Sequence, residues 1–193
     1  FNGVAARPLY HPPPLADRLH PGEYGDYVLL VGRLEAVKRA DLAIRALASV
    51  PASVRLIVVG DGSQRSAAEH AAAQAGVADR VVFAGTATGN ELISLYAGAL
   101  AVVYVPFDED YGYVTLEAFL AMKPVVTAND SGGTLEFVRD GENGFVCVPE
   151  PEPIGPAIAQ LADNRHRARE LGERGRARAL EITWDGVVEQ LVG

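Results

Sequence analysis

Short apolar runs and longer amphipathic stretches alternate along most of this chain. Between the runs, apolar residues recur at helical spacing, as at residues 40–47 and 90–99. The runs themselves are rich in β-branched residues, which is typical of strands in a parallel sheet that is covered on both faces. With right-handed crossovers, this pattern predicts an α/β fold, a doubly wound Rossmann-like parallel sheet with helices on both faces. The predicted strands span residues 27–32, 55–60, 80–85, 101–105, 124–128 and 144–148.

The two ends of the chain depart from this alternation. Residues 1–26, called the N-terminal segment below, are rich in proline and predict a surface segment or a linker from a preceding domain. From residue 153 onward the chain is expected to be helical, and residues 27–193 form one domain. The expected helices span residues 153–162, 164–181 (arginine-rich on its solvent side) and 184–192.

Composition narrows the function classes. The 193 residues are 49% hydrophobic and 22% charged, which suits one domain with a full core. A net charge of −8 argues against a general nucleic-acid surface, and no apolar run is long enough to cross a bilayer. The single cysteine, Cys147, fits a reducing cytosol and lies in an apolar run, so we expect a buried structural thiol. The four histidines have no ligand spacing, so we expect no metal site.

Two glutamates eight positions apart form the strongest candidate site. Glu109 lies in the loop after an apolar strand, and Glu117 lies on the second turn of a helix that begins near Gly112. Glu117 can accept both hydroxyls of a ribose, and Glu109 can accept hydroxyls of a transferred sugar. The early helix amides at Gly112, Tyr113 and Val114 suit phosphate or sugar oxygens. The plain alternative is a solvated acidic loop and an ordinary helix.

Two cations follow the first strand, at the mouth of the predicted sheet. Arg33 offers a planar fork of donors and Lys38 a mobile point charge. A diphosphate leaving group gains negative charge as its bond to a sugar breaks, and such cations can stabilise it. Two solvated surface cations are the alternative, but the nearby glutamate pair favours the functional interpretation.

Glycines mark several strand ends. Gly32, Gly60 and Gly85 allow a ligand to approach the backbone closely, although ordinary turns would explain Gly60 and Gly62 better. A third candidate site is the glycine-rich junction at residues 131–134, followed by Glu136 within a helix. For this junction, a plain helix cap and a ligand-facing role are equally supported.

In order and spacing, these elements resemble the C-terminal half of a GT-B-fold glycosyltransferase of the large retaining family 4, the glycosyl transferases group 1. Each element alone is weak, but their combination is highly specific and covers nearly the whole chain. The matched elements are Gly32-Arg33-Leu34 with Lys38, Val59-Gly60-Asp61-Gly62, Val82-Phe83-Ala84-Gly85, Glu109 with Glu117, Lys123-Pro124-Val125-Val126, Gly132-Gly133 with Glu136, and Asp140-Gly141-Glu142-Asn143-Gly144.

The resemblance implies a role for each site residue. Arg33 and Lys38 would hold the diphosphate of a nucleotide-sugar donor, Glu109 the sugar and Glu117 the ribose. Backbone near Gly85 would flank the base, and the amides of residues 112–114 would face the donor. Transfer would proceed with retention, without a metal or a cofactor, and with Arg33, Lys38 and Glu109 as the catalytic residues. The base (uracil, guanine or adenine), the sugar and the acceptor stay open.

The resemblance also implies that a partner domain is missing. Such enzymes carry the acceptor in a first Rossmann-like domain, so we expect this chain alone to bind a sugar nucleotide weakly and not to turn over. Trp184 and the last helix resemble the segment that packs back toward that domain. The location would be cytoplasmic, with any membrane contact made through the first domain.

Three departures from the family pattern carry expectations of their own. Met122 stands where a glycine is common, which indicates a different turn. Asp110 and Tyr111 replace a small residue and a phenylalanine, which would alter the choice of donor. Ala5 stands where an aspartate is frequent, so that contact is in doubt.

Other functions fit the sequence less well. A sugar-nucleotide epimerase with a GT-B fold would share the donor site, whereas a phosphorylase would need a pyridoxal-binding lysine context. A dinucleotide oxidoreductase would carry Gly-x-Gly-x-x-Gly after the first strand, and Gly32-Arg33 lacks the second and third glycines. A non-catalytic sugar-nucleotide sensor or interaction domain stays open as an alternative, although a purely structural module would not need all four charged residues together.

Overall fold

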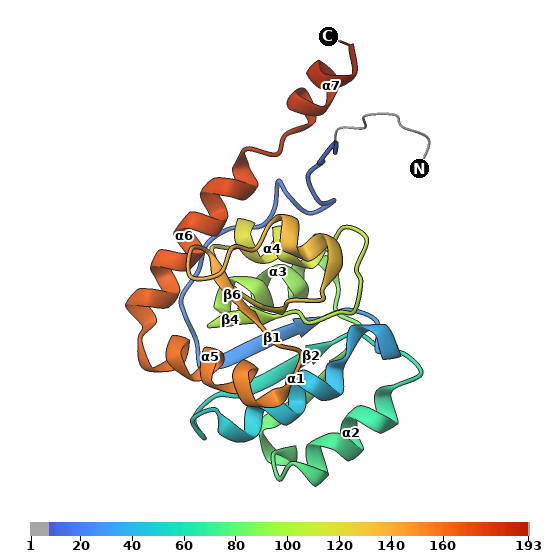
Figure 1. Ribbon diagram of the computed structural model, residues 1–193, viewed down its shortest axis with the longest axis vertical. Coiled ribbons are helices and arrows are strands. Elements are labelled where there is room, and N and C mark those ends of the chain that lie inside the picture. The colour runs from blue at the N-terminus through green and yellow to red at the C-terminus, as the bar shows by residue number, and fades with distance from the viewer. Residues whose placement is uncertain (1–7, 193) are drawn as a thin grey trace.

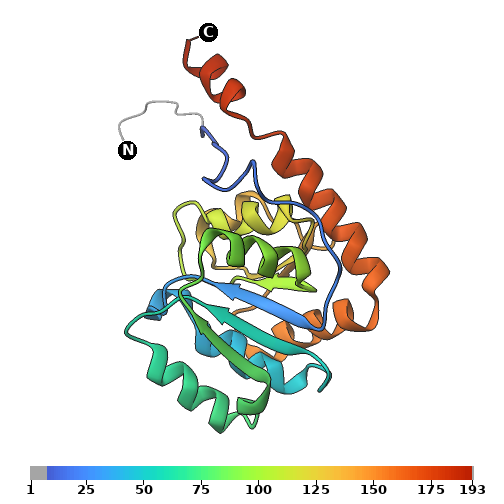
Figure 2. The ribbon, with the colours of Figure 1, turned by 180° about the vertical axis from the view of Figure 1, so that it is seen from behind.

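The computed structural model describes residues 8–192 as a parallel six-stranded sheet between two layers of helices (Figures 1 and 2). The strand order is β3-β2-β1-β4-β5-β6, with every neighbouring pair parallel. The predicted fold class is therefore confirmed. The strands are β1 (Tyr27–Val31), β2 (Arg55–Val59), β3 (Val81–Gly85), β4 (Ala101–Val103), β5 (Val125–Ala128) and β6 (Gly144–Cys147).

Helices cover both faces of this sheet. One face packs against α1, α2 and α5, and the other packs against α3 and α4 (Figure 1). The α-helices are α1 (Ala40–Ala46), α2 (Arg65–Gln74), α3 (Gly89–Gly98), α4 (Tyr113–Leu120), α5 (Pro151–Asp163), α6 (Arg165–Leu180) and α7 (Trp184–Val192). Short 3-10 turns are η1 (Ala36–Lys38), η2 (Leu47–Ser49), η3 (Ala78–Arg80) and η4 (Gly132–Glu136).

The apolar character of the central strands follows from this layering. In β1, Val28 and Leu30 pack with the helices of one face, and Leu29 packs with those of the other. Successive strand residues point to opposite faces, so a strand that is buried on both sides favours apolar residues at successive positions.

The strand order reverses between β1 and β4, which are neighbours in space. In open parallel sheets, the crevice outside the carboxyl ends of the strands at such a reversal is where ligands bind. The loops that follow β1 and β4 therefore border the candidate site.

A buried lysine attaches the N-terminal segment to the domain. Lys123, in the turn between α4 and β5, donates to the carbonyl oxygens of Gly22 at 2.9 Å and Glu23 at 3.0 Å. Its ammonium lies 3.9 Å from the centre of the Tyr24 ring. Residues 22–24 are thus held against the fold. Residues 1–7, and with them Ala5, lie outside the described part of the chain.

Two local expectations are wrong. The junction at residues 131–134 leads into the 3-10 turn η4 and not into an α-helix. Met122 has φ +60°, the left-handed conformation that glycine adopts most easily, so the turn is one that glycine would fit.

The sequence predicted that the arginines of α6 lie on its solvent side. Several of them instead bind backbone carbonyl groups of neighbouring segments. Arg165 donates to the carbonyl oxygens of Tyr24 and Gly25, and Arg176 donates to that of Leu120 at the end of α4. Together these arginines hold α6 against the N-terminal segment and α4. Arg178 similarly donates to the carbonyl oxygen of Glu136 at 2.6 Å.

Candidate functional site

Lys38 and Glu109 meet at the reversal of strand order. Lys38 ends η1 in the loop after β1, and Glu109 lies in the loop between β4 and α4. The Lys38 ammonium forms an ion pair with Oε2 of Glu109, and the Tyr104 hydroxyl donates to the same oxygen at 2.5 Å. Both charged side chains are mostly shielded from solvent, with 19% and 18% of their surfaces exposed. The structure thus brings together two residues that the sequence placed in one candidate site, and their roles there stay a prediction.

The charge state of Glu109 is set by its partners. Burial by itself raises the pKa of this carboxyl, but hydrogen bonds from Lys38 and Tyr104 outweigh it and hold the pKa below its usual value. Arg33 adds its positive charge to the same effect while its side chain remains exposed. The three residues predicted to be catalytic therefore share one electrostatic site, in which Glu109 is an anion at neutral pH.

Glu117 lies in a different environment. It occupies the second turn of α4, as predicted, and only 9% of its surface is exposed. Burial raises the pKa of its carboxyl, and a hydrogen bond of 2.8 Å from the Tyr96 hydroxyl on α3 partly opposes this. Because Tyr96 occupies Oε2, it also fixes the orientation of the other carboxyl oxygen.

The first turn of α4 begins at Gly112, which has φ +77°. A side chain at this position would place its first carbon 2.8 Å from Oγ1 of Thr134, so glycine is required by the backbone angle and by space. Tyr113 is exposed and Val114 is half-buried. The backbone amides of the first turn of α4, a helix of eight residues, therefore lie next to the loop that carries Glu109.

The glycine pair at residues 132–133 supports the Glu109 loop. The Gly133 amide donates to the carbonyl oxygen of Glu109 at 2.6 Å, and a Cβ on Gly132 would lie 2.5 Å from that oxygen. These contacts favour a positioning role over a ligand-facing role for the pair. Glu136 is exposed and accepts a hydrogen bond from the hydroxyl of Tyr10, in the N-terminal segment.

The strand-end glycines beyond β1 hold neighbouring loops together. A Cβ on Gly60 would collide with the Gly32 carbonyl, and the Gly60 amide donates to the carbonyl oxygen of Gly85 at 2.8 Å. This agrees with the structural interpretation of Gly60. Next to Gly85, at the end of β3, a hollow of about 510 Å³ is lined by Ala84, Thr86, Ala87, Asn90, Glu91, Ser94 and Leu95.

Sequence reasoning missed Arg39, which joins three loops. Its guanidinium makes two hydrogen bonds to the Asp130 carboxylate, at 2.8 and 2.6 Å. It also donates to the carbonyl oxygens of Val105 and Pro106, both at 2.7 Å. The segment after β4 is thereby fixed to the loops after β1 and β5. Only its place beside Lys38 could have drawn attention to it.

Two expectations about other chemistry can be compared with the geometry. Burial raises the pKa of the Cys147 thiol to about 11, and its Sγ donates to the carbonyl oxygen of Pro153 at 3.6 Å. Both observations fit a structural thiol, although the residue is half-buried and not fully enclosed.

Among residues 8–192, no cluster of histidine, cysteine and carboxylate side chains could hold a metal ion. Within the same residues, no helix has the length and apolarity needed to cross a membrane.

Several known proteins are similar to this chain in sequence. The sequence profile of the family described as glycosyl transferases group 1 matches residues 18–178. The D-inositol 3-phosphate glycosyltransferase of Acidothermus cellulolyticus is 36% identical over 182 residues, covering 88% of this chain and 40% of that protein. Human alpha-1,3/1,6-mannosyltransferase ALG2 is 30% identical over 181 residues, covering 85% of this chain and 43% of that protein. The chain thus spans about 40% of the length of the curated relatives it matches.

Solved structures show the same likeness. Anabaena HepE in complex with UDP superimposes with a TM-score of 0.80 at 27% identity, covering 86% of this chain and 47% of that chain. TarM superimposes with a TM-score of 0.81 at 21% identity, over 96% of this chain and 37% of that chain, and at this identity shows the fold alone. The neighbours are GT-B glycosyltransferases.

Proposed function

Since the chain belongs to the glycosyl transferases group 1 family, we propose that it is the donor-binding domain of a retaining, metal-independent family 4 glycosyltransferase. Its donor is a nucleoside-diphosphate sugar, and it needs no cofactor. The observation that carries this proposal is the contact between Lys38 and Glu109 at the reversal of strand order. A cation for a diphosphate and a carboxylate for a sugar lie side by side, where doubly wound sheets bind nucleotides.

In this proposal, the two cations of the β1 loop bind the diphosphate. Arg33 is exposed and available to an incoming phosphate. Lys38 exchanges part of its contact with Glu109 for a phosphate oxygen when the donor enters. As the bond between sugar and phosphate breaks, negative charge collects on the diphosphate, and both cations stabilise it. The Glu109 carboxylate, freed when the donor enters, accepts hydrogen bonds from hydroxyls of the bound sugar.

The rest of the donor lies along the edge between β4 and β3. Glu117, oriented by Tyr96, accepts the ribose hydroxyls, and backbone near Gly85 flanks the base. Amides of residues 112–114 face the phosphates or the sugar. HepE has been solved with UDP and with UDP-glucose, which makes UDP-glucose the first donor to test on this chain.

The whole protein is proposed to be larger than this chain, because the curated relatives are longer. In that protein, an acceptor-binding domain precedes the N-terminal segment, which serves as the linker. We expect a cytoplasmic enzyme in which any membrane contact is made through the preceding domain. The chain by itself then binds the donor weakly and does not transfer sugar.

Calorimetric binding of UDP, GDP, ADP and NAD tests the proposal. One nucleoside diphosphate should bind, and Arg33→Ala should weaken it by more than about 1.5 kcal/mol, as loss of a charge-assisted contact does. The matched control is Arg45→Ala, which removes an exposed arginine of α1 that pairs with Asp41. Binding of NAD instead, or equal behaviour of the two variants, would refute the donor site. Transfer of sugar by this chain alone would refute the need for another domain.

A further inference from the structure

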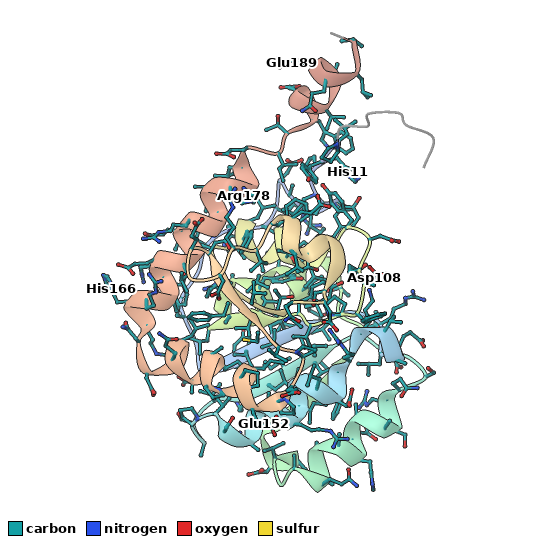
Figure 3. All side chains as sticks on the ribbon, viewed as in Figure 1. His11, Asp108, Glu152, His166, Arg178 and Glu189 are labelled. Atoms are coloured by element: carbon teal, nitrogen blue, oxygen red, sulfur yellow. The ribbon has the colours of Figure 1, made fainter. Side chains whose placement is uncertain are left out.

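Aromatic side chains from distant parts of the sequence gather beside the Glu109 loop. His11 belongs to the N-terminal segment, Tyr111 to the loop between the two glutamates, and Trp184 begins α7. Figure 3 shows His11 below α7, and its ring contacts Trp184 at the start of that helix. We call this the aromatic cluster, and its members are Tyr10, His11, Tyr111, Tyr113, Phe137 and Trp184.

The His11 ring lies between two other rings of the cluster. It stacks on Tyr111 with a centroid distance of 4.9 Å and an angle of 8°, and on Trp184 at 5.5 Å and 19°. Beneath the stack, Tyr111 contacts the edge of the buried Phe137 ring at 5.4 Å. The cluster is thus continuous from the core of the domain to the first residue of α7.

The Tyr111 hydroxyl fixes the backbone of His11 in both directions. The His11 amide donates to this hydroxyl at 2.7 Å, and the hydroxyl donates to the His11 carbonyl oxygen at 2.6 Å. Burial raises the pKa of Tyr111, so the hydroxyl keeps its proton at neutral pH. A phenylalanine would fill the same space and could make neither hydrogen bond. The hydroxyl therefore has a use in this chain that is separate from the choice of donor.

Tyr111 is also part of the segment that forms the site. It lies two residues after Glu109 and immediately before Gly112, the N-cap of α4. Gly133 holds this segment from the opposite side through the Glu109 carbonyl. A displacement of the Tyr111 ring is therefore transmitted to the Glu109 carboxylate and to the first amides of α4 through only one or two peptide units.

We propose that Tyr111 is a positioning residue that couples the donor site to the N-terminal segment and to the start of α7. The coupling rests on the proposed donor function of the Glu109 loop. Binding of a donor favours the arrangement of the loop in which the His11 stack is closed. By thermodynamic reciprocity, a closed stack strengthens donor binding by the same factor. The two chain segments outside the sheet thereby sense whether the site is occupied.

Trp184 supplies the readout, because it is the only tryptophan in the sequence. Acrylamide quenching of its fluorescence, with and without UDP, GDP and ADP, should be measured for the wild type, Tyr111→Phe and Tyr27→Phe. Tyr27→Phe is the matched control, since its hydroxyl donates to a backbone carbonyl, that of Leu95, at a similar 2.7 Å, away from the cluster. Binding of each nucleotide is followed separately by calorimetry.

We expect Tyr111→Phe to increase quenching of Trp184 without ligand and to weaken nucleotide binding about threefold to tenfold, the effect of one or two neutral hydrogen bonds. Nucleotide should protect Trp184 in the wild type and in Tyr27→Phe, and this protection should be lost in Tyr111→Phe. If nucleotide binds all three equally and quenching does not differ, the coupling is refuted while the donor site stands. If no nucleotide binds the wild type by calorimetry, the proposed function fails, and the donor coupling fails with it.

A second variant guards against misfolding of the first. His11→Ala removes the ring between Tyr111 and Trp184 but keeps the backbone atoms that bond to the Tyr111 hydroxyl. It should abolish the protection of Trp184 by nucleotide and lower nucleotide affinity less than Tyr111→Phe does. Full protection in His11→Ala would contradict the role of the stack. Circular dichroism shows whether each variant is folded.

Discussion

The Lys38 ammonium and the Glu109 carboxylate form an ion pair that joins the loop after β1 to the loop after β4. Each is the other's counter-ion. In the proposed donor site, a diphosphate that binds Lys38 would release Glu109 for the sugar, so binding at the phosphate position and at the sugar position would be linked. The first two predictions follow from this relationship.

Glu109→Gln should affect the affinity for the nucleotide and the affinity for the nucleotide sugar differently. The variant frees Lys38 and loses the anionic acceptor for sugar hydroxyls, so UDP should bind as well as or better than in the wild type. UDP-glucose should lose about 1.5 kcal/mol of affinity, as expected for a charge-assisted hydrogen bond. Calorimetry with both ligands checks this, with Glu69→Gln on α2, an exposed carboxylate paired with Arg65, as the control. Equal losses for UDP and UDP-glucose would contradict the assignment.

Lys38→Met should change the dependence of stability on acid. The folded-state pKa of Glu109 lies below its unfolded value, so the stabilisation is present above about pH 4.3 and is lost as the pH falls through the folded value. The variant should be less stable than the wild type by about 1 kcal/mol at neutral pH. Urea unfolding at several pH values should show the two proteins converging as the pH falls through the folded-state pKa of Glu109. A constant difference across that range would mean that the ion pair is not its source.

Glu117→Gln should stabilise the fold and weaken the site. Burial raises the folded-state pKa of Glu117 above the unfolded value, so the folded state binds more protons and stability falls as pH rises through that interval. A glutamine carries no charge and still accepts the Tyr96 hydrogen bond. At neutral pH we expect a gain on the order of 1 kcal/mol and a flatter pH profile.

Nucleotide binding by the same variant should fall about tenfold, because a neutral amide accepts ribose hydroxyls less strongly than a carboxylate does. The wild type and Glu117→Gln can be compared by urea unfolding and by calorimetry with UDP. A stabilised variant with unchanged affinity would remove Glu117 from the ribose position.

Lys123 should make stability increase under mildly alkaline conditions. Burial lowers its pKa to about 8, whereas the unfolded value is about 10.4. Between these values the unfolded state binds more protons, so stability rises with pH. Burial raises the pKa of Tyr24, which reverses the trend above about pH 10. Lys123→Met should flatten the profile between pH 8 and 10, as thermal unfolding can measure, and an unchanged profile would place the titrating group elsewhere.

The sequence was sufficient for the sheet because burial on both faces favours apolar residues at successive strand positions, as Val28, Leu29 and Leu30 show. It was also sufficient to bring Lys38 and Glu109 together, because both follow strands whose carboxyl ends share one edge. The roles of Arg39 and Tyr104 could not be predicted in this way. Their contacts depend on which loops become neighbours in space, and no local pattern in the chain carries that information.

The wrong expectations have similar causes. An amphipathic pattern shows which arginines of α6 point away from the hydrophobic core. It does not show that Arg165 and Arg176 bind carbonyl groups of the N-terminal segment and of α4. In η4, the close approach of Gly132 and Gly133 to the Glu109 loop restricts the chain to a tight turn. The propensity of the following residues does not reveal that constraint.

Under the proposed function, Arg39 matters for attempts to change the donor sugar. Arg39 forms hydrogen bonds to the segment after β4 and to Asp130 after β5, so it holds the loops that follow β1, β4 and β5 together. Exchanging residues 107–112 with those of a relative would replace the Glu109 loop alone. The Arg39 guanidinium, which holds the start of this loop through the carbonyl oxygens of Val105 and Pro106, would not be exchanged with it. Engineering by loop transplantation should therefore treat Arg39 and Asp130 as part of the graft.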